Sequence, residues 1–80
     1  MRQCVGLAKI RELARSGQAR QIRLNADLSL REMAGDLDTD PSSLSRWETG
    51  RTKPSPEVAL RWLDLLLRIQ ALEQGAVRAS

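Results

Sequence analysis

The chain has 80 residues, of which 41% are hydrophobic and 29% charged, and its formal net charge is +3. This length and composition predict one soluble globular domain over residues 1–80, and no stretch approaches the roughly 18 apolar residues of a membrane span. The lack of histidine and the single cysteine exclude histidine-based catalysis, histidine-ligated metals and an intrachain disulfide. We therefore expect no enzymatic activity, no cofactor and a cytoplasmic location.

The positive charge is concentrated near the N-terminus. Residues 1–28 carry six basic and two acidic side chains, whereas residues 29–53 carry four basic and five acidic ones. Eleven of the 13 basic residues are arginine, which suits bidentate contacts with phosphate or guanine but is also what codon bias in a GC-rich genome would produce. The net charge alone is therefore weak evidence for polyanion binding.

Helix signals begin near the N-terminus, and no segment alternates as a strand would. Apolar residues at helical spacing predict a helix over residues 5–15. Ser16-Gly17 then separates it from a second short helical segment over residues 18–26, unless one helix continues past the glycine.

Three further helices have distinct start and stop signals. Ser29 and Glu32 form a capping box. Asp40-Pro41 combines a capping side chain with proline at the first helical position, and Ser55-Pro56 repeats that signal. The resulting helices are expected over residues 29–37, 41–49 (stopped by Gly50) and about 56–74 (stopped by Gly75). The fold class predicted is all-α with five helices.

The helices at 29–37 and 41–49, joined by a short turn, have the dimensions of a helix-turn-helix at about residues 29–49. On a helical wheel the second of them places Leu44 and Trp47 on one side. The opposite face carries short hydroxyls and one arginine, namely Ser42, Ser45, Arg46 and Thr49. Such a face suits close approach to phosphates and base edges, although a plain polar surface would fit as well.

Glu48 lies beside Leu44 and Trp47 on the wheel, where a buried carboxylate would be costly without a cation. Arg23, in the helix before the helix-turn-helix, is well placed to provide it. The pattern therefore predicts a structural Arg23–Glu48 ion pair that would orient the exposed face of 41–49, the alternative being a solvated Glu48 at a helix end.

Two runs, Leu28–Ala34 and Leu44–Ser55, resemble the Xre / Cro–cI helix-turn-helix family of phage and bacterial transcriptional regulators. The specific part is the string Ser-Arg-Trp-Glu-Thr-Gly-Arg-Thr-Lys-Pro-Ser within the second run. The resemblance covers about residues 18–67 and leaves 1–17 and 68–80 as flanking helical extensions. It implies a compact lambda-repressor-like domain with an extended C-terminal helix, whose recognition helix is 41–49.

The resemblance also implies roles for individual side chains. Arg46 stands where base readout is expected, of a guanine through its O6 and N7 atoms. The expected base contacts are Pro41, Ser42, Ser43 and Arg46. The expected contacts with the DNA backbone are Ser45, Thr49, Arg51, Lys53 and Arg31. Arg23 and Glu48 match the buried ion pair of the family, and Trp47 matches a core position.

Three positions depart from the family pattern. Leu30 replaces the usual phosphate-gripping Gln, and Asp38 replaces the Gly that is usual in the turn. Asp40, at the cap of the recognition helix, would face phosphates that repel it. These departures predict weak intrinsic DNA affinity, compensated by a second subunit or by basic residues elsewhere.

The last helix carries an apolar stripe that steps by three and four residues, as in a coiled coil. We expect it to be a homodimer seam made by Val58, Trp62, Leu65, Ile69 and Leu72, with the helix at 5–15 contributing; purely intramolecular packing is the alternative.

The sequence thus predicts a dimeric, Cro-like repressor that binds an inverted-repeat operator in double-stranded DNA, at the nucleoid or in host cytoplasm if phage-encoded. One alternative is an antitoxin-like autoregulator whose C-terminal helix binds a partner protein. Another is a protein–protein module that has lost DNA binding.

Overall fold

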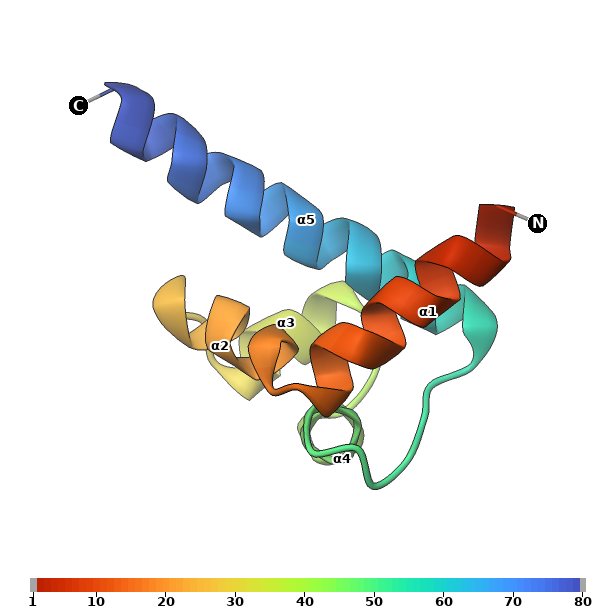
Figure 1. Ribbon diagram of the computed structural model, residues 1–80. Coiled ribbons are helices and arrows are strands. Elements are labelled where there is room, and N and C mark those ends of the chain that lie inside the picture. The colour runs from red at the N-terminus through yellow and green to blue at the C-terminus, as the bar shows by residue number, and fades with distance from the viewer. Residues whose placement is uncertain (1, 80) are drawn as a thin grey trace.

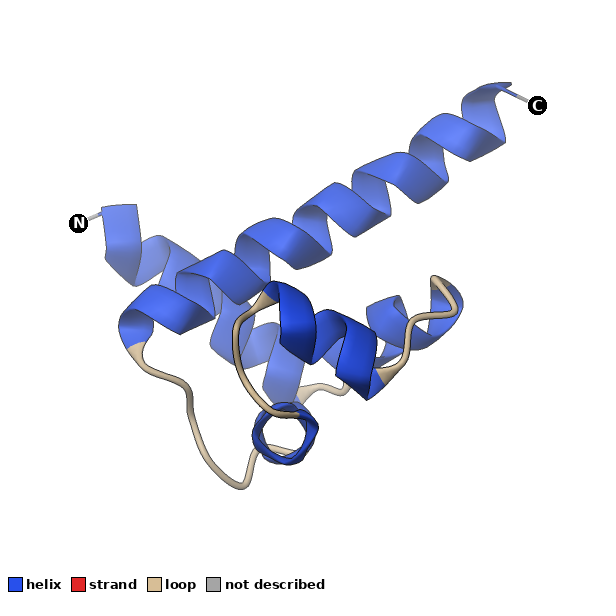
Figure 2. Ribbon diagram, turned by 180° about the vertical axis from the view of Figure 1, so that it is seen from behind, coloured by secondary structure: helices blue, strands red, loops and turns tan. Residues whose placement is uncertain are grey.

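The computed structural model describes the backbone of residues 2–79 and the side chains of residues 3–73. Over that range the chain is helical with connecting loops and contains no strand (Figures 1 and 2). The helices are α1 (Arg2–Arg15), α2 (Gln18–Asn25), α3 (Leu30–Asp36), α4 (Pro41–Glu48) and α5 (Pro56–Ala79). The predicted all-α fold with five helices is confirmed.

Helices α3 and α4 begin at side-chain caps. The Glu32 amide donates to the Ser29 hydroxyl oxygen at 3.0 Å, and the Ser29 amide donates to the Glu32 carboxylate at 2.9 Å. The Asp40 carboxylate accepts from the Ser43 amide at 2.9 Å, with Pro41 in the first turn. Both starts lie where the sequence signals predicted them, because a cap depends on residues only three positions apart.

Helices α2, α3 and α4 end at residues in the left-handed conformation, Asp27 (φ 59°), Asp38 (φ 56°) and Gly50 (φ 75°). At each end, the amide of the left-handed residue and the amide after it donate to carbonyls of the last helical turn. Gly50 is therefore the predicted stop of α4. Aspartate tolerates this conformation better than most residues, so Asp38 can hold the turn that glycine would otherwise make.

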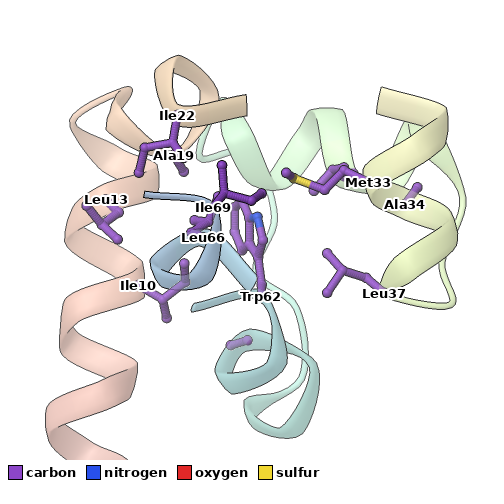
Figure 3. Close-up of a cluster of buried hydrophobic side chains, with 12 residues drawn as sticks. Ile10, Leu13, Ala19, Ile22, Met33, Ala34, Leu37, Trp62, Leu66 and Ile69 are labelled. Carbon is purple, nitrogen blue, oxygen red and sulfur yellow. The ribbon is translucent and has the colours of Figure 1, made fainter. Parts of the chain in front are cut away.

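The core lies where α5 crosses the other helices. Figure 3 shows its side chains Trp62, Leu66 and Ile69 between residues of α1 and α2 on one side and of α3 on the other. The buried apolar residues are Ile10, Leu13, Ala19, Ile22, Met33, Ala34, Leu37, Leu44, Ala59, Trp62, Leu66 and Ile69. All five helices contribute to this core.

The expected dimer seam on α5 is wrong in two of its five members. Trp62 and Ile69 are only 1% and 8% exposed, because they pack within the chain. Val58 and Leu65 are half-buried, and Leu72 is 74% exposed. The error has a physical cause: a core stripe on a long helix and a coiled-coil seam share the same spacing of three and four residues.

Helix α1 packs along α5 within the chain. Such intramolecular packing was the alternative to a dimer through the apolar face of α5. Gly6 lies so close to α5 that an added β-carbon would stand 2.7 Å from a Leu60 methyl group and 3.6 Å from a Leu63 methyl group. Helix α5 also continues to Ala79 rather than stopping at Gly75. None of the helices described here is long and apolar enough to cross a membrane.

Candidate nucleic-acid interface

Helix α4 is the second helix of a helix-turn-helix and follows α3 after a turn of four residues, Leu37–Asp40. Its inner side is held by Leu44, which is fully buried, and by Trp47, which is half-buried. The Trp47 ring packs against Trp62 of α5, with 6.0 Å between ring centroids and 48° between ring planes. Trp47 is thus part of the packing and not a free stacking surface for bases.

The outer side of α4 is open. Ser42, Arg46 and Thr49 are exposed and Ser45 is half-buried, so the four residues singled out on the wheel lie on the side away from Leu44. Around the first turn, Pro41 is exposed and Ser43 is half-buried. The residues expected to contact bases therefore lie at both ends of α4, with Arg46 in the last turn and the other three in the first.

The loop that follows α4 adds two exposed cations, Arg51 and Lys53. The Arg51 amide donates to the Arg46 carbonyl at 2.9 Å, which fixes the start of this loop relative to the recognition helix. Arg31 is exposed on the first turn of α3. Within residues 3–73, none of these arginines, Arg46 included, forms an ion pair.

A buried ion pair orients α4. Arg23 of α2 donates from Nε to Glu48 Oε2 at 2.7 Å and from Nη2 to Glu48 Oε1 at 3.1 Å. Both residues are buried, at 6% and 5% exposed. Glu48 is therefore not solvated, and the two parallel bonds give the pair a fixed geometry.

A family model described as a helix-turn-helix domain matches residues 16–74. The chain belongs to this family. No curated protein and no solved structure matches the chain. The matched residues include α2 to α4 and most of α5, a wider span than residues 18–67, and they leave α1 outside. Membership of the helix-turn-helix family, together with the all-helical fold, indicates a DNA-binding regulator.

Two hydroxyls of this helix-turn-helix are already engaged within the chain. The Ser43 hydroxyl donates to the Asp40 carboxylate at 2.7 Å. The Thr49 hydroxyl donates back to the carbonyls of Ser45 and Arg46, at 3.1 and 3.2 Å. Phosphate oxygens accept hydrogen bonds, so either hydroxyl must rotate before it can donate to DNA. This leaves Arg46 as the strongest free donor on α4.

The departures from the family pattern have structural consequences. Leu30 is half-buried and packs against the core, so an apolar contact takes the place of a phosphate-binding amide. Hydrogen bonds from the Ser43 hydroxyl and amide hold the pKa of Asp40 below its usual value, with a smaller contribution from nearby Arg46. Asp40 therefore stays ionised at the N-terminal end of α4.

Two supporting contacts were not predicted from the sequence. Arg23 also donates from Nη1 to the Leu28 carbonyl at 2.9 Å, so it braces the chain between α2 and α3. Arg61 of α5 donates to the Leu37 carbonyl at 3.3 Å, at the end of α3. Both acceptors are main-chain carbonyls, one in the loop before α3 and one at its C-cap, and no side-chain pattern indicates them.

The described residues contain no group of three or more histidine, cysteine, aspartate or glutamate side chains that could hold a metal ion. Cys4 is exposed on α1, away from α4 in sequence, and has no assigned role.

Proposed function

We propose that the protein is a sequence-specific transcriptional regulator of the Xre / Cro–cI type, which places α4 in the major groove of double-stranded DNA. The observation that carries this proposal is the buried Arg23–Glu48 pair. It fixes α4 so that its side with Ser42 and Arg46 remains open, as a groove-reading helix requires.

Base readout is assigned to the first turn of α4 and to Arg46 in its last turn. Arg46 would donate to a guanine, with Pro41, Ser42 and Ser43 close to neighbouring base edges. The contacts that position the protein on the phosphates are assigned to exposed or half-buried side chains around this helix, namely Arg31, Ser45, Thr49, Arg51 and Lys53.

The regulator would act as a Cro-like homodimeric repressor, because two recognition helices about 34 Å apart can read an inverted repeat. Support comes from α5, which extends beyond the rest of the fold (Figure 1). Val58, Leu65 and Leu72 lie seven residues apart on one side of it, and Leu72 is 74% exposed. Light scattering at micromolar concentration should give a dimer with or without DNA, and a monomer in both conditions would refute the dimer.

Selection of bound duplexes from a random double-stranded pool tests the DNA-binding proposal. The expected result is an enriched inverted repeat with half-sites about one helical turn apart. Affinity for the selected duplex should fall steeply with salt, and random duplex should bind at least a thousandfold more weakly. A pool that shows no enrichment after several rounds would contradict sequence-specific binding.

A second candidate is an antitoxin-like autoregulator, in which the same exposed side of α5 binds a partner protein. The exposed Leu72 favours it as much as it favours a dimer. The two candidates differ in what Leu72→Glu does: it should dissociate a homodimer in pure protein, whereas an autoregulator would lose a co-purifying partner and keep its own oligomeric state.

A further inference from the structure

A cleft of about 340 Å³ lies between α1, the loop after α4 and the first turns of α5. Trp47 and Trp62, which are the only tryptophans of the chain, both line it. Helix α1 supplies the facing wall and lies outside residues 16–74, which the helix-turn-helix family model matches. The cleft is therefore formed between the matched residues and a helix that lies outside the match.

The charge lining the cleft is positive. Arg11 and Arg15 line it from α1, and Lys53 lines it from the loop. Glu12 is the acid among the lining residues, and its carboxylate is bound to Arg15. Arg11 and Lys53 are exposed and form no ion pair within residues 3–73, so two cations on opposite walls remain available to a ligand.

We propose that this cleft binds a small organic anion, a carboxylate carried on an apolar body. The apolar body would lie against the half-buried indole ring of Trp47, because Trp62 is only 1% exposed. The carboxylate would lie between Arg11 and Lys53. A volume of about 340 Å³ is within the range of small-molecule sites, which are mainly apolar with a few polar groups that fix orientation. The pairing of carboxylate and guanidinium adds a charge-assisted hydrogen bond.

Occupation of the cleft would also weaken DNA binding, a consequence that rests on the proposed function. Lys53 lines the cleft and follows Arg51 in the loop assigned to the DNA backbone. A carboxylate bound to Lys53 neutralises a cation that DNA would otherwise use. Because coupling between two ligands is reciprocal, DNA must lower the affinity for the anion by the same factor.

The first experiment needs no DNA, so it stands apart from the proposed function. Phenylbutyrate is titrated into the full-length protein while tryptophan fluorescence is recorded, with excitation at the red edge of indole absorption, where the phenyl ring is transparent. Trp47 lines the cleft and is half-buried, so binding against its ring should give a saturable change. The uncharged analogue phenylbutanol should bind more weakly, by about two- to fivefold.

Three variants of exposed cations locate the anion. Arg11→Gln and Lys53→Gln should each weaken phenylbutyrate binding by about two- to fivefold and leave phenylbutanol binding unchanged. Lys9→Gln is the matched control, because Lys9 is exposed on α1 but does not line the cleft. The circular dichroism spectrum and the melting temperature of each variant should equal those of the wild type.

Three results would overturn the proposal. The first is the absence of a saturable fluorescence change with phenylbutyrate. The second is equal binding of phenylbutyrate and phenylbutanol with no effect of Arg11→Gln, which would leave an apolar surface without a preference for anions. The third is an Arg11→Gln variant that weakens DNA binding but not phenylbutyrate binding, which would mean that the cations serve DNA.

The second experiment tests the coupling on the selected duplex. Saturating phenylbutyrate should reduce DNA affinity and lower the salt slope by about one, since one phosphate contact is lost. An unchanged DNA affinity would refute the coupling while leaving the anion site, established by the first experiment, in place.

Discussion

Arg23 of α2 and Glu48 of α4 stand 25 residues apart in the sequence and form a buried ion pair with two parallel hydrogen bonds, of 2.7 and 3.1 Å. The third contact of the guanidinium, to the Leu28 carbonyl, connects the same arginine to the segment before α3. One side chain thus holds α2, the start of α3 and the end of α4 in a fixed arrangement. The orientation of the open side of α4 depends on it.

Glu48→Ala should lower the free energy of unfolding by about 3–5 kcal/mol, because it leaves the Arg23 guanidinium buried without its carboxylate. Urea denaturation followed by circular dichroism measures the change. For comparison, Asp64→Ala removes an exposed i,i+4 partner of Arg68 and should cost less than about 1 kcal/mol.

The double variant Arg23→Met with Glu48→Leu serves as the control for burial. It removes both charges and fills the space, so its free energy of unfolding should be closer to that of the wild type than the value for Glu48→Ala. It still loses the bond to the Leu28 carbonyl, so full recovery is not expected. A loss below 1 kcal/mol for Glu48→Ala would show that the pair does not hold α4.

The burial of Glu48 could be predicted because its evidence is local, whereas the choice of Arg23, 25 residues away, also rested on the family resemblance. Glu48 falls beside Leu44 and Trp47 on one short helix, and a carboxylate there demands a cation. The caps at Ser29 and Asp40 are local in the same sense, since their partners lie three residues away. Features of this kind need no knowledge of how the helices pack.

The assignment of Trp62 and Ile69 to a dimer seam failed because it depends on packing between distant segments. Trp62 and Ile69 have the spacing of a coiled-coil seam, and only the positions of α1, α2 and α3 around α5 show that they are in the core. The cleft beside Trp47 was not foreseen for the same reason: its walls come from segments about 40 residues apart in the sequence.

Arg46→Ala and Arg51→Ala should affect DNA binding differently. Loss of Arg46 should cost about 1–3 kcal/mol on the selected duplex and relax base preference at one position. Loss of Arg51 should weaken binding to all duplexes to a similar extent and reduce the salt slope by about one. Fluorescence anisotropy at several salt concentrations, on the selected duplex, on its single-base variants and on random duplex, measures the loss of affinity, the base preference and the salt slope. Equal losses on every duplex for both variants would contradict the assignment of Arg46 to base readout.

Asp38→Gly should raise the free energy of unfolding by up to about 1 kcal/mol, because glycine adopts the left-handed backbone of this position without steric cost. It also removes an acid from the turn that precedes the recognition helix, so DNA binding should become tighter at low salt.

Asp38→Asn separates these two effects. It removes the charge and keeps a side chain that tolerates a left-handed backbone, so it should match Asp38→Gly in DNA affinity but not in thermal stability. If Asp38→Gly proves less stable than Asp38→Asn, the backbone at this position carries no strain that glycine relieves.

Asp40 should make the stability of the fold depend on pH below the usual carboxyl range. The Ser43 hydroxyl and amide donate to the carboxylate, so the pKa of Asp40 is lower in the folded chain than its ordinary value of 3.8. A lowered folded pKa means that the stabilisation is fully present above that ordinary value and is lost as pH falls through the lowered one. Asp40→Asn keeps a capping oxygen but cannot titrate, so its melting temperature should fall less on acidification than that of the wild type.

Ser43→Ala removes the hydroxyl donor, and carbon NMR titration should then show the pKa of Asp40 moving back toward 3.8. An unchanged pKa in Ser43→Ala would mean that the hydroxyl does not stabilise the charged form, and the cap would rest on the backbone amide alone.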